Sequence, residues 1–354
     1  MVPGDPDREA LLHALRHGEP IQRKDLSGLE LREADLSGAV FEQVRFAGEQ
    51  LKGADLRETS LVGCDLSGAD LAGANLHHTD FVRCRLSQAS LAAADLTLTN
   101  FVECDLRGAS FAGGTLPVSV FIKCDLTGAK FTKSRLDRVR MLECEVGEMV
   151  LAGADVFQLT CYQADFRTVD FAGAKVAQTI LVACRFGARD FSGLAFPYCQ
   201  FTDCDLRGAS FREANVHDAN FKGADLSGAC FEKANARNCV FLGTKLERAS
   251  LAGGDFKEAI FAEADLGRAN ASGANLYQAV FEKAKCVETR FIGATLTYAD
   301  FSHADISFAD FSHASLFRTR FHATLESGVV FSNRSLALGD DEKRKQAEDF
   351  VPRH

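Results

Sequence analysis

Cysteine is the residue type whose spacing in this sequence most suggests chemistry. Seven of the twelve cysteines share one 20-residue register, namely Cys64, Cys84, Cys104, Cys124, Cys144, Cys184 and Cys204. A column of thiols could form disulfides or bind zinc. Side chains stacked in parallel favour packing over bridging, however, and zinc needs four convergent ligands. We therefore interpret these cysteines as small apolar core residues.

The histidines and aspartates do not form a recognisable catalytic set. His303 and His313 are ten residues apart, so in a 20-residue period they lie on opposite sides, and the His77–His78 pair has no partner in the pattern. The aspartates recur at one repeat position, where carboxylates satisfy backbone groups at corners. No phosphate-binding glycine loop, nucleophile elbow or metal motif is present. We predict no catalytic residue, no metal ligand, no cofactor and no enzymatic activity.

A five-residue repeat specifies the elements that hold these residues. Every fifth residue from Leu26 to Phe321 is apolar over 60 positions, of which 26 are Leu and 24 are Phe. We call this residue the centre. The residue two before it is usually small, the one before it is often Asp or Asn, and the one two after it is often Gly. This period fits neither a helix nor a strand. Similar residues recur every 10 and 20 positions, which predicts a square coil of four repeats stacked on the next coil.

The stretches CDLSGADLAGANL and ANFKGADLSGACF resemble the pentapeptide-repeat family. The resemblance implies an all-β solenoid, a right-handed quadrilateral parallel β-helix whose centre and small residue point inward. Here it would have about 15 coils and a length of roughly 72 Å. We predict a helical cap over residues 1–25, with a helix at 6–17 and Asp5 as its N-cap, the β-helix over 26–338, and a polar tail over 339–354. The tail is expected to be frayed or to form a short helix.

The repeat is irregular between about 139 and 199. The small inward position is occupied there by Val139, Met149, Leu159, Val169, Arg189 and Leu194. Glu49 is a further exception. The stretch is either a local distortion of the coil or a degenerate patch without a role, and an inward arginine must be paired or tilted outward.

An outward apolar stripe marks one face of the predicted coil. The residues that directly follow or precede centres on this face are the candidate partner-binding residues: Val62, Val82, Val102, Val120, Ile122, Leu142, Tyr162, Ile180, Val182, Val240, Leu242, Ile260 and Val280. A contiguous exposed apolar strip is typical of an interaction surface. The alternative is that β-branched residues simply favour a sheet face.

Composition narrows the class of partner. The net charge of −9 gives little electrostatic support for binding nucleic acid or anionic lipid. No apolar run is long enough to span a membrane, and the first twenty residues lack the apolar core of a signal peptide. Twelve cysteines without an export signal indicate a reducing compartment, so we expect a cytoplasmic protein. Because a filled rod has no pocket, we expect no small-molecule substrate.

These features predict a non-catalytic scaffold that binds another protein or a second copy of itself. The segment LLHALRHGEPIQRKDLSGLELREADLSGA also resembles the start of pentapeptide segments in bacterial type VI secretion accessory modules, which implies an effector adaptor. The alternative is a DNA-mimicking modulator of DNA gyrase, as in the quinolone-resistance branch of the family. Duplex DNA carries one charge per about 1.7 Å, whereas this rod would carry roughly one per 8 Å.

Overall fold

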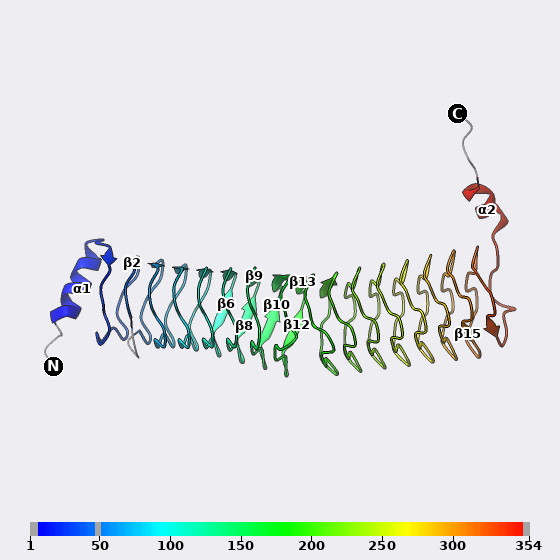
Figure 1. Ribbon diagram of the computed structural model, residues 1–354, viewed down its shortest axis with the longest axis horizontal. Coiled ribbons are helices and arrows are strands. Elements are labelled where there is room, and N and C mark those ends of the chain that lie inside the picture. The colour runs from blue at the N-terminus through cyan, green and yellow to red at the C-terminus, as the bar shows by residue number, and fades with distance from the viewer. Residues whose placement is uncertain (1–5, 47–50, 350–354) are drawn as a thin grey trace, which may run out of the picture. The chain divides into compact units, whose positions relative to one another are not determined.

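The computed structural model describes residues 6–46 and 51–349. The chain divides into two compact units, Met1–Cys184 and Arg185–His354, and each is a stack of parallel coils (Figure 1). The predicted parallel β-helix of about 15 coils with an N-terminal helix is confirmed. Along the described residues, no helix has the length and apolar character needed to cross a membrane.

Each coil takes 20 residues, as the period predicts. In the first unit Leu61 pairs with Phe81 in the next coil, and in the second unit Val240 pairs with Ile260. Corners are closed by a backbone hydrogen bond between residues three apart in the sequence, such as that from the Ala54 N–H to the Leu51 carbonyl at 3.0 Å. The residue two after the centre adopts a positive φ, 65° at Gly53. This left-handed conformation explains why glycine is frequent there.

The core consists of the centres and the small residues two before them. Phe101 is fully buried, and its ring stacks on those of Phe81 and Phe121 with centroids 4.9 Å apart in both pairs. In the second unit Phe261 stacks in the same way between Phe241 and Phe281. Because like residues stack on like residues, each coil provides the packing surface for the next.

The first unit begins with helix α1 (Pro6–Arg16), which matches the predicted cap helix, and Leu11 of this helix is buried. One parallel sheet contains, in spatial order, β1 (Ile21–Gln22), β2 (Val40–Glu42), β3 (Ser60–Val62), β4 (Asp80–Val82), β5 (Asn100–Val102), β7 (Val120–Ile122), β9 (Arg140–Leu142), β11 (Thr160–Tyr162) and β13 (Ile180–Val182). A second sheet contains β6 (Thr115–Pro117), β8 (Arg135–Asp137), β10 (Asp155–Phe157) and β12 (Lys175–Ala177).

The second unit has fewer regular strands. These are β14 (Gln200–Thr202) and the pair β15 (Asp310–Phe311) and β16 (Val330–Phe331), which shows that one more repeat follows Glu326. Elsewhere its coils are joined by isolated parallel bridges at the same 20-residue step, except at the end, where Arg320 is bridged to Leu338. Helix α2 (Glu342–Glu348) lies in the predicted tail and begins at the N-cap Asp341, so the tail forms a short helix.

The irregular stretch remains part of the core over most of its length. Val139, Met149 and Val169 are fully buried at the inward position, so the coil accommodates larger residues there. Arg189 is only half-buried, and its backbone N–H donates to the Gly187 carbonyl at 2.8 Å. Gly187 has a positive φ one residue after its centre instead of two, which shifts the corner. The boundary between the units falls in this stretch. Glu49 and Asp5 lie outside the described residues.

Candidate interaction face and a histidine–glutamate cluster

The nine candidate residues of the first unit all lie on the sheet that runs from β1 to β13. Val62, Val82, Val102, Ile122 and Leu142 are directly paired neighbours on β3, β4, β5, β7 and β9. Tyr162 on β11 pairs in the same way with Val182 on β13. We call these seven residues the stripe. Its members are half-buried, except Tyr162, which is 44% exposed. The stripe is therefore paired from coil to coil between Val62 and Leu142, and again between Tyr162 and Val182.

Two further candidates in the first unit flank the stripe without forming a column of their own. Val120 pairs with Asn100 on one neighbouring strand and with Arg140 on the other, and Ile180 pairs with Thr160 on β11. Both are half-buried on the outer surface. They widen the apolar surface locally at β7 and β13.

The four candidates of the second unit form a smaller patch. Val240, Ile260 and Val280 stack in register, and Ile260 is 38% exposed. Leu242 is half-buried two residues after Val240. These residues therefore lie on an outer face as predicted.

Charged residues stand directly beside the stripe. Arg83, Glu103, Lys123 and Glu143 each follow a stripe residue, and all four are exposed. Their signs alternate along the coil axis. Lys123 lies 3.9 Å from Glu143. The apolar strip therefore has a rim of alternating charge.

The column of cysteines is buried, as predicted, but it has a polar role as well. The Sγ of Cys104 lies 3.3 Å from the carbonyl oxygen of Phe81, 23 residues earlier. Cys64, Cys84, Cys124 and Cys144 make the same contact with the coil before them. The interpretation as apolar filler is thus incomplete, because each thiol also donates a weak hydrogen bond.

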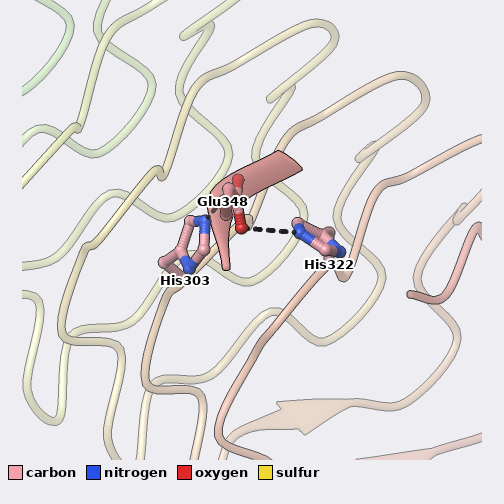
Figure 2. Close-up of side chains that lie close together, drawn as sticks. All are labelled: His303, His322 and Glu348. Atoms are coloured by element: carbon pink, nitrogen blue, oxygen red, sulfur yellow. Dashed lines mark hydrogen bonds and ion pairs between the residues drawn. The ribbon is translucent and has the colours of Figure 1, made fainter. Parts of the chain in front are cut away.

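A second cluster lies at the end of the second unit, where His303, His322 and Glu348 converge (Figure 2). The Nε2 of His322 is 3.2 Å from Oε2 of Glu348, and the Nε2 of His303 is 3.3 Å from Oε1. His322 is buried, with 1% of its side chain exposed, whereas His303 and Glu348 are 30% and 36% exposed. The cluster thus has a closed side and an open side.

The surroundings of Glu348 favour its charged form. Desolvation alone would raise the pKa of this carboxyl, but hydrogen bonds from Arg344, His322 and His303 lower it to about 2. Arg344 donates to Oε1 at 2.8 Å. The carboxylate therefore stays ionised at any ordinary pH, with cationic or imidazole groups around it.

Helix α2 is held against the coils by the same residues. Arg344 reaches Ser302 at 3.2 Å and Glu282 at 3.8 Å, and Glu348 reaches His322. Glu282, Ser302 and His322 each directly follow a centre and are spaced by 20 residues, the register position that the stripe occupies in the first unit. In these last coils that position is polar and covered by α2.

Sequence reasoning missed this cluster. His303 and His322 are 19 residues apart, one less than a coil, which places them side by side on neighbouring coils. The more regular ten-residue spacing of His303 and His313 places that pair on opposite sides. Glu348 lies beyond the repeat, so no periodicity predicts its position.

Comparison with known proteins identifies the family. The family model for pentapeptide repeats matches residues 50–88, 84–117, 104–141, 199–235, 231–262, 259–297 and 284–322. These ranges cover more than half of the chain and omit most of the irregular stretch. No curated protein matches the sequence.

Solved structures of similar sequence are also repeat proteins of this kind. A trypsin-treated form of QnrB1, a plasmid-mediated fluoroquinolone resistance protein, is 26% identical over 55% of this chain and 99% of its own, with a TM-score of 0.24. HetL, involved in heterocyst differentiation regulation in the cyanobacterium Nostoc, is 25% identical over 80% of this chain and 95% of its own, with a TM-score of 0.16. Because these TM-scores are low, the likenesses support no functional conclusion. The extent of the family match shows that the chain belongs to the pentapeptide-repeat family.

Proposed function

We propose that this protein is a non-catalytic interaction scaffold that binds through the stripe, and that the occupant of the stripe is a second copy of the chain. The observation that carries the proposal is the paired column of aliphatic side chains from β3 to β9 with its alternating charged rim. A rigid coil presents such a column at low entropic cost, because its backbone is already fixed.

The order of the rim charges favours self-association. A two-fold axis along the strand direction, placed between β5 and β7, packs two copies face to face with their coil axes antiparallel. Glu103 then faces Lys123 of the other copy, and Arg83 faces Glu143. The same operation places Val102 against Ile122. Apolar residues thus meet apolar residues, and each positive charge meets a negative one.

The strip supports an association of modest strength. Five adjacent coils span about 20 Å between the first and last strand, at about 4.8 Å a step. The aliphatic side chains are half-buried by their neighbours, so the apolar area left to bury is limited. Interfaces at the low end of the size range form transient complexes. We therefore expect a monomer–dimer equilibrium that depends on protein concentration.

Sedimentation velocity over a concentration series tests this proposal. Val102→Asp or Ile122→Asp places a carboxylate at the centre of the apolar contact, and each is expected to weaken association at least tenfold. Lys123→Glu is expected to weaken it as well, because two glutamates would then face each other. The double variant Glu103→Lys with Lys123→Glu restores opposite charges and should restore association.

A matched control uses another lysine of the same unit. Lys133 is exposed, and its φ of 55° is close to the 53° of Lys123, but it lies half a coil away from the stripe. Lys133→Glu should leave association unchanged. The proposal is wrong if the wild-type chain is a monomer at every concentration, or if the double charge exchange is no better than Lys123→Glu alone.

Two narrower hypotheses remain from the sequence. An adaptor role in type VI secretion has no support from the comparisons and stays a hypothesis. A gyrase modulator would act on DNA supercoiling, and the sparse negative charge disfavours DNA mimicry. Inhibition of gyrase supercoiling by micromolar protein would favour that second function over the scaffold.

A further inference from the structure

We propose that His303, His322 and Glu348 bind one divalent transition-metal ion, of which zinc fits best, and that the ion fastens helix α2 to the last coils. The three side chains come from two neighbouring coils and the tail helix. An ion bound to all three would therefore join a segment outside the repeat to the repeat itself.

The distances between the ligand atoms suit tetrahedral coordination. Zinc binds imidazole nitrogen at about 2.0–2.1 Å, which gives ligand–ligand separations of about 3.3–3.5 Å. The Nε2 of His303 lies 3.3 Å from Oε1 of Glu348 and the Nε2 of His322 lies 3.2 Å from Oε2, so each separation has that length but involves a different carboxylate oxygen. All three ligand atoms lie within 4.8 Å of one another, so a small side-chain movement closes the site.

The donor set selects the kind of ion. Two imidazoles and one carboxylate suit zinc, copper and nickel, whereas magnesium and calcium prefer oxygen ligands alone. The exposed sides of His303 and Glu348 leave room for water at a fourth position. Three protein ligands and one water are a common arrangement around zinc.

The hydrogen bonds of His322 show how the ring would accept an ion. Its Nδ1 accepts the Asp341 N–H at 3.1 Å, so the ring proton is on Nε2 and is donated to Glu348. Metal binding at Nε2 moves this proton to Nδ1 and displaces the Asp341 N–H. The nearest carboxylate oxygen to Nδ1 is that of Asp340 at 3.7 Å, and it is held by the Ala323 N–H at 2.8 Å. A carboxylate behind the ligating histidine is the usual supporting contact.

Arg344 is the built-in competitor of the ion. Its guanidinium donates to Oε1 of Glu348, and a metal ion would take over this oxygen. Glu282, 3.8 Å from Arg344, is an alternative partner for the released guanidinium. Because Arg344 also holds α2 against the coils, the cleaner test is Asp340→Asn, which should lower the affinity for zinc by removing the carboxylate behind Nδ1 of His322.

Calorimetric titration of the chelator-treated full chain with zinc tests the site. We expect one ion per chain, with affinity lowered at least tenfold by His303→Asn and by Glu348→Gln. Both residues are partly exposed, so the variants should fold, and the buried His322 is left unchanged. The matched controls His313→Asn and Glu342→Gln, outside the cluster, should bind zinc as the wild type does.

Two further readouts separate this site from the cysteines and from simple surface binding. Cobalt bound at the cluster should show tetrahedral absorption without a thiolate charge-transfer band. Zinc should also slow tryptic cleavage after Lys343 and Lys345 in α2. The proposal would be overturned by absence of zinc binding, by a thiolate band in the cobalt spectrum, or by His303→Asn and Glu348→Gln variants that bind zinc as tightly as the wild type.

Discussion

The hydroxyl of Thr99 donates to the carbonyl oxygen of Leu76 at 2.8 Å, 23 residues earlier in the chain. The same step joins the Sγ of Cys104 to the carbonyl of Phe81. Thr99 and Cys104 stand on either side of strand β5 and are buried. A polar side chain on each side of the strand therefore ties it to the preceding coil.

We expect the Thr99 hydroxyl to stabilise the first unit. Thr99→Val keeps the shape of the side chain but removes the donor, so the free energy of unfolding should fall by about 1 kcal/mol. Urea unfolding followed by circular dichroism measures this change. Thr99→Ser keeps the hydroxyl and loses only a methyl group. Comparing the two variants therefore separates the contribution of the hydrogen bond from that of packing. A valine variant as stable as the wild type would show that the bond contributes nothing.

The left-handed corner position predicts opposite effects for two reciprocal substitutions. Gly113 has a φ of 66°, and among the described residues no atom lies within 4 Å of a Cβ added there, so Gly113→Ala tests conformation alone. It should lower stability by about 1 kcal/mol. Ala93 has a φ of 54° one coil earlier, so Ala93→Gly should raise stability, by a smaller amount.

The control for this pair is Ala92→Gly, because Ala92 precedes the left-handed position and should lose stability through added backbone freedom. Thermal unfolding of the three variants measures the differences. A loss of stability in Ala93→Gly equal to that in Ala92→Gly would contradict the explanation of the glycine preference.

Paired aspartates predict how the fold responds to acid. A hydrogen bond from the Arg107 side chain, helped by the Arg107 N–H, lowers the pKa of Asp105. A carboxyl with a lowered folded-state pKa stabilises the fold fully above its unfolded value, about 3.9. That stabilisation is lost as the pH falls through the folded value.

We therefore expect Asp105→Asn to be less stable than the wild type at pH 7, with a difference that shrinks below about pH 4. Denaturant unfolding at a series of pH values measures it. Arg107→Gln removes the main cause and should reduce the pH-dependent part of the difference. A difference that is constant from pH 7 to pH 2 would assign the effect to packing instead.

The cysteines should differ sharply in reactivity. Cys230 is half-buried, whereas the other eleven are buried, and burial raises the pKa of the Cys239 thiol. Because the thiolate is the reactive form, we expect Ellman's reagent to modify one thiol rapidly in the native protein and twelve in urea. Cys230→Ser should abolish the rapid phase. Rapid modification of several native thiols would show that the coils open easily.

Sequence alone predicted the coil, its core and the register of the stripe. The reason is that neighbouring coils meet at a fixed 20-residue step, so a local rule repeated along the chain specifies the long-range contacts. Val102 and Ile122 had to be neighbours once the period was known. The interpretation of Cys104 was incomplete, because the rule gives its position but not the direction of its thiol.

The tertiary structure alone decided what lies outside that rule. Glu348 belongs to a helix beyond the repeat, and its meeting with His322 depends on contacts of Arg344 with Ser302 and Glu282 that no period encodes. The corner at Gly187 likewise follows from a single displaced glycine. Periodic sequence determines periodic contacts, whereas contacts between non-equivalent residues depend on how individual side chains pack in three dimensions.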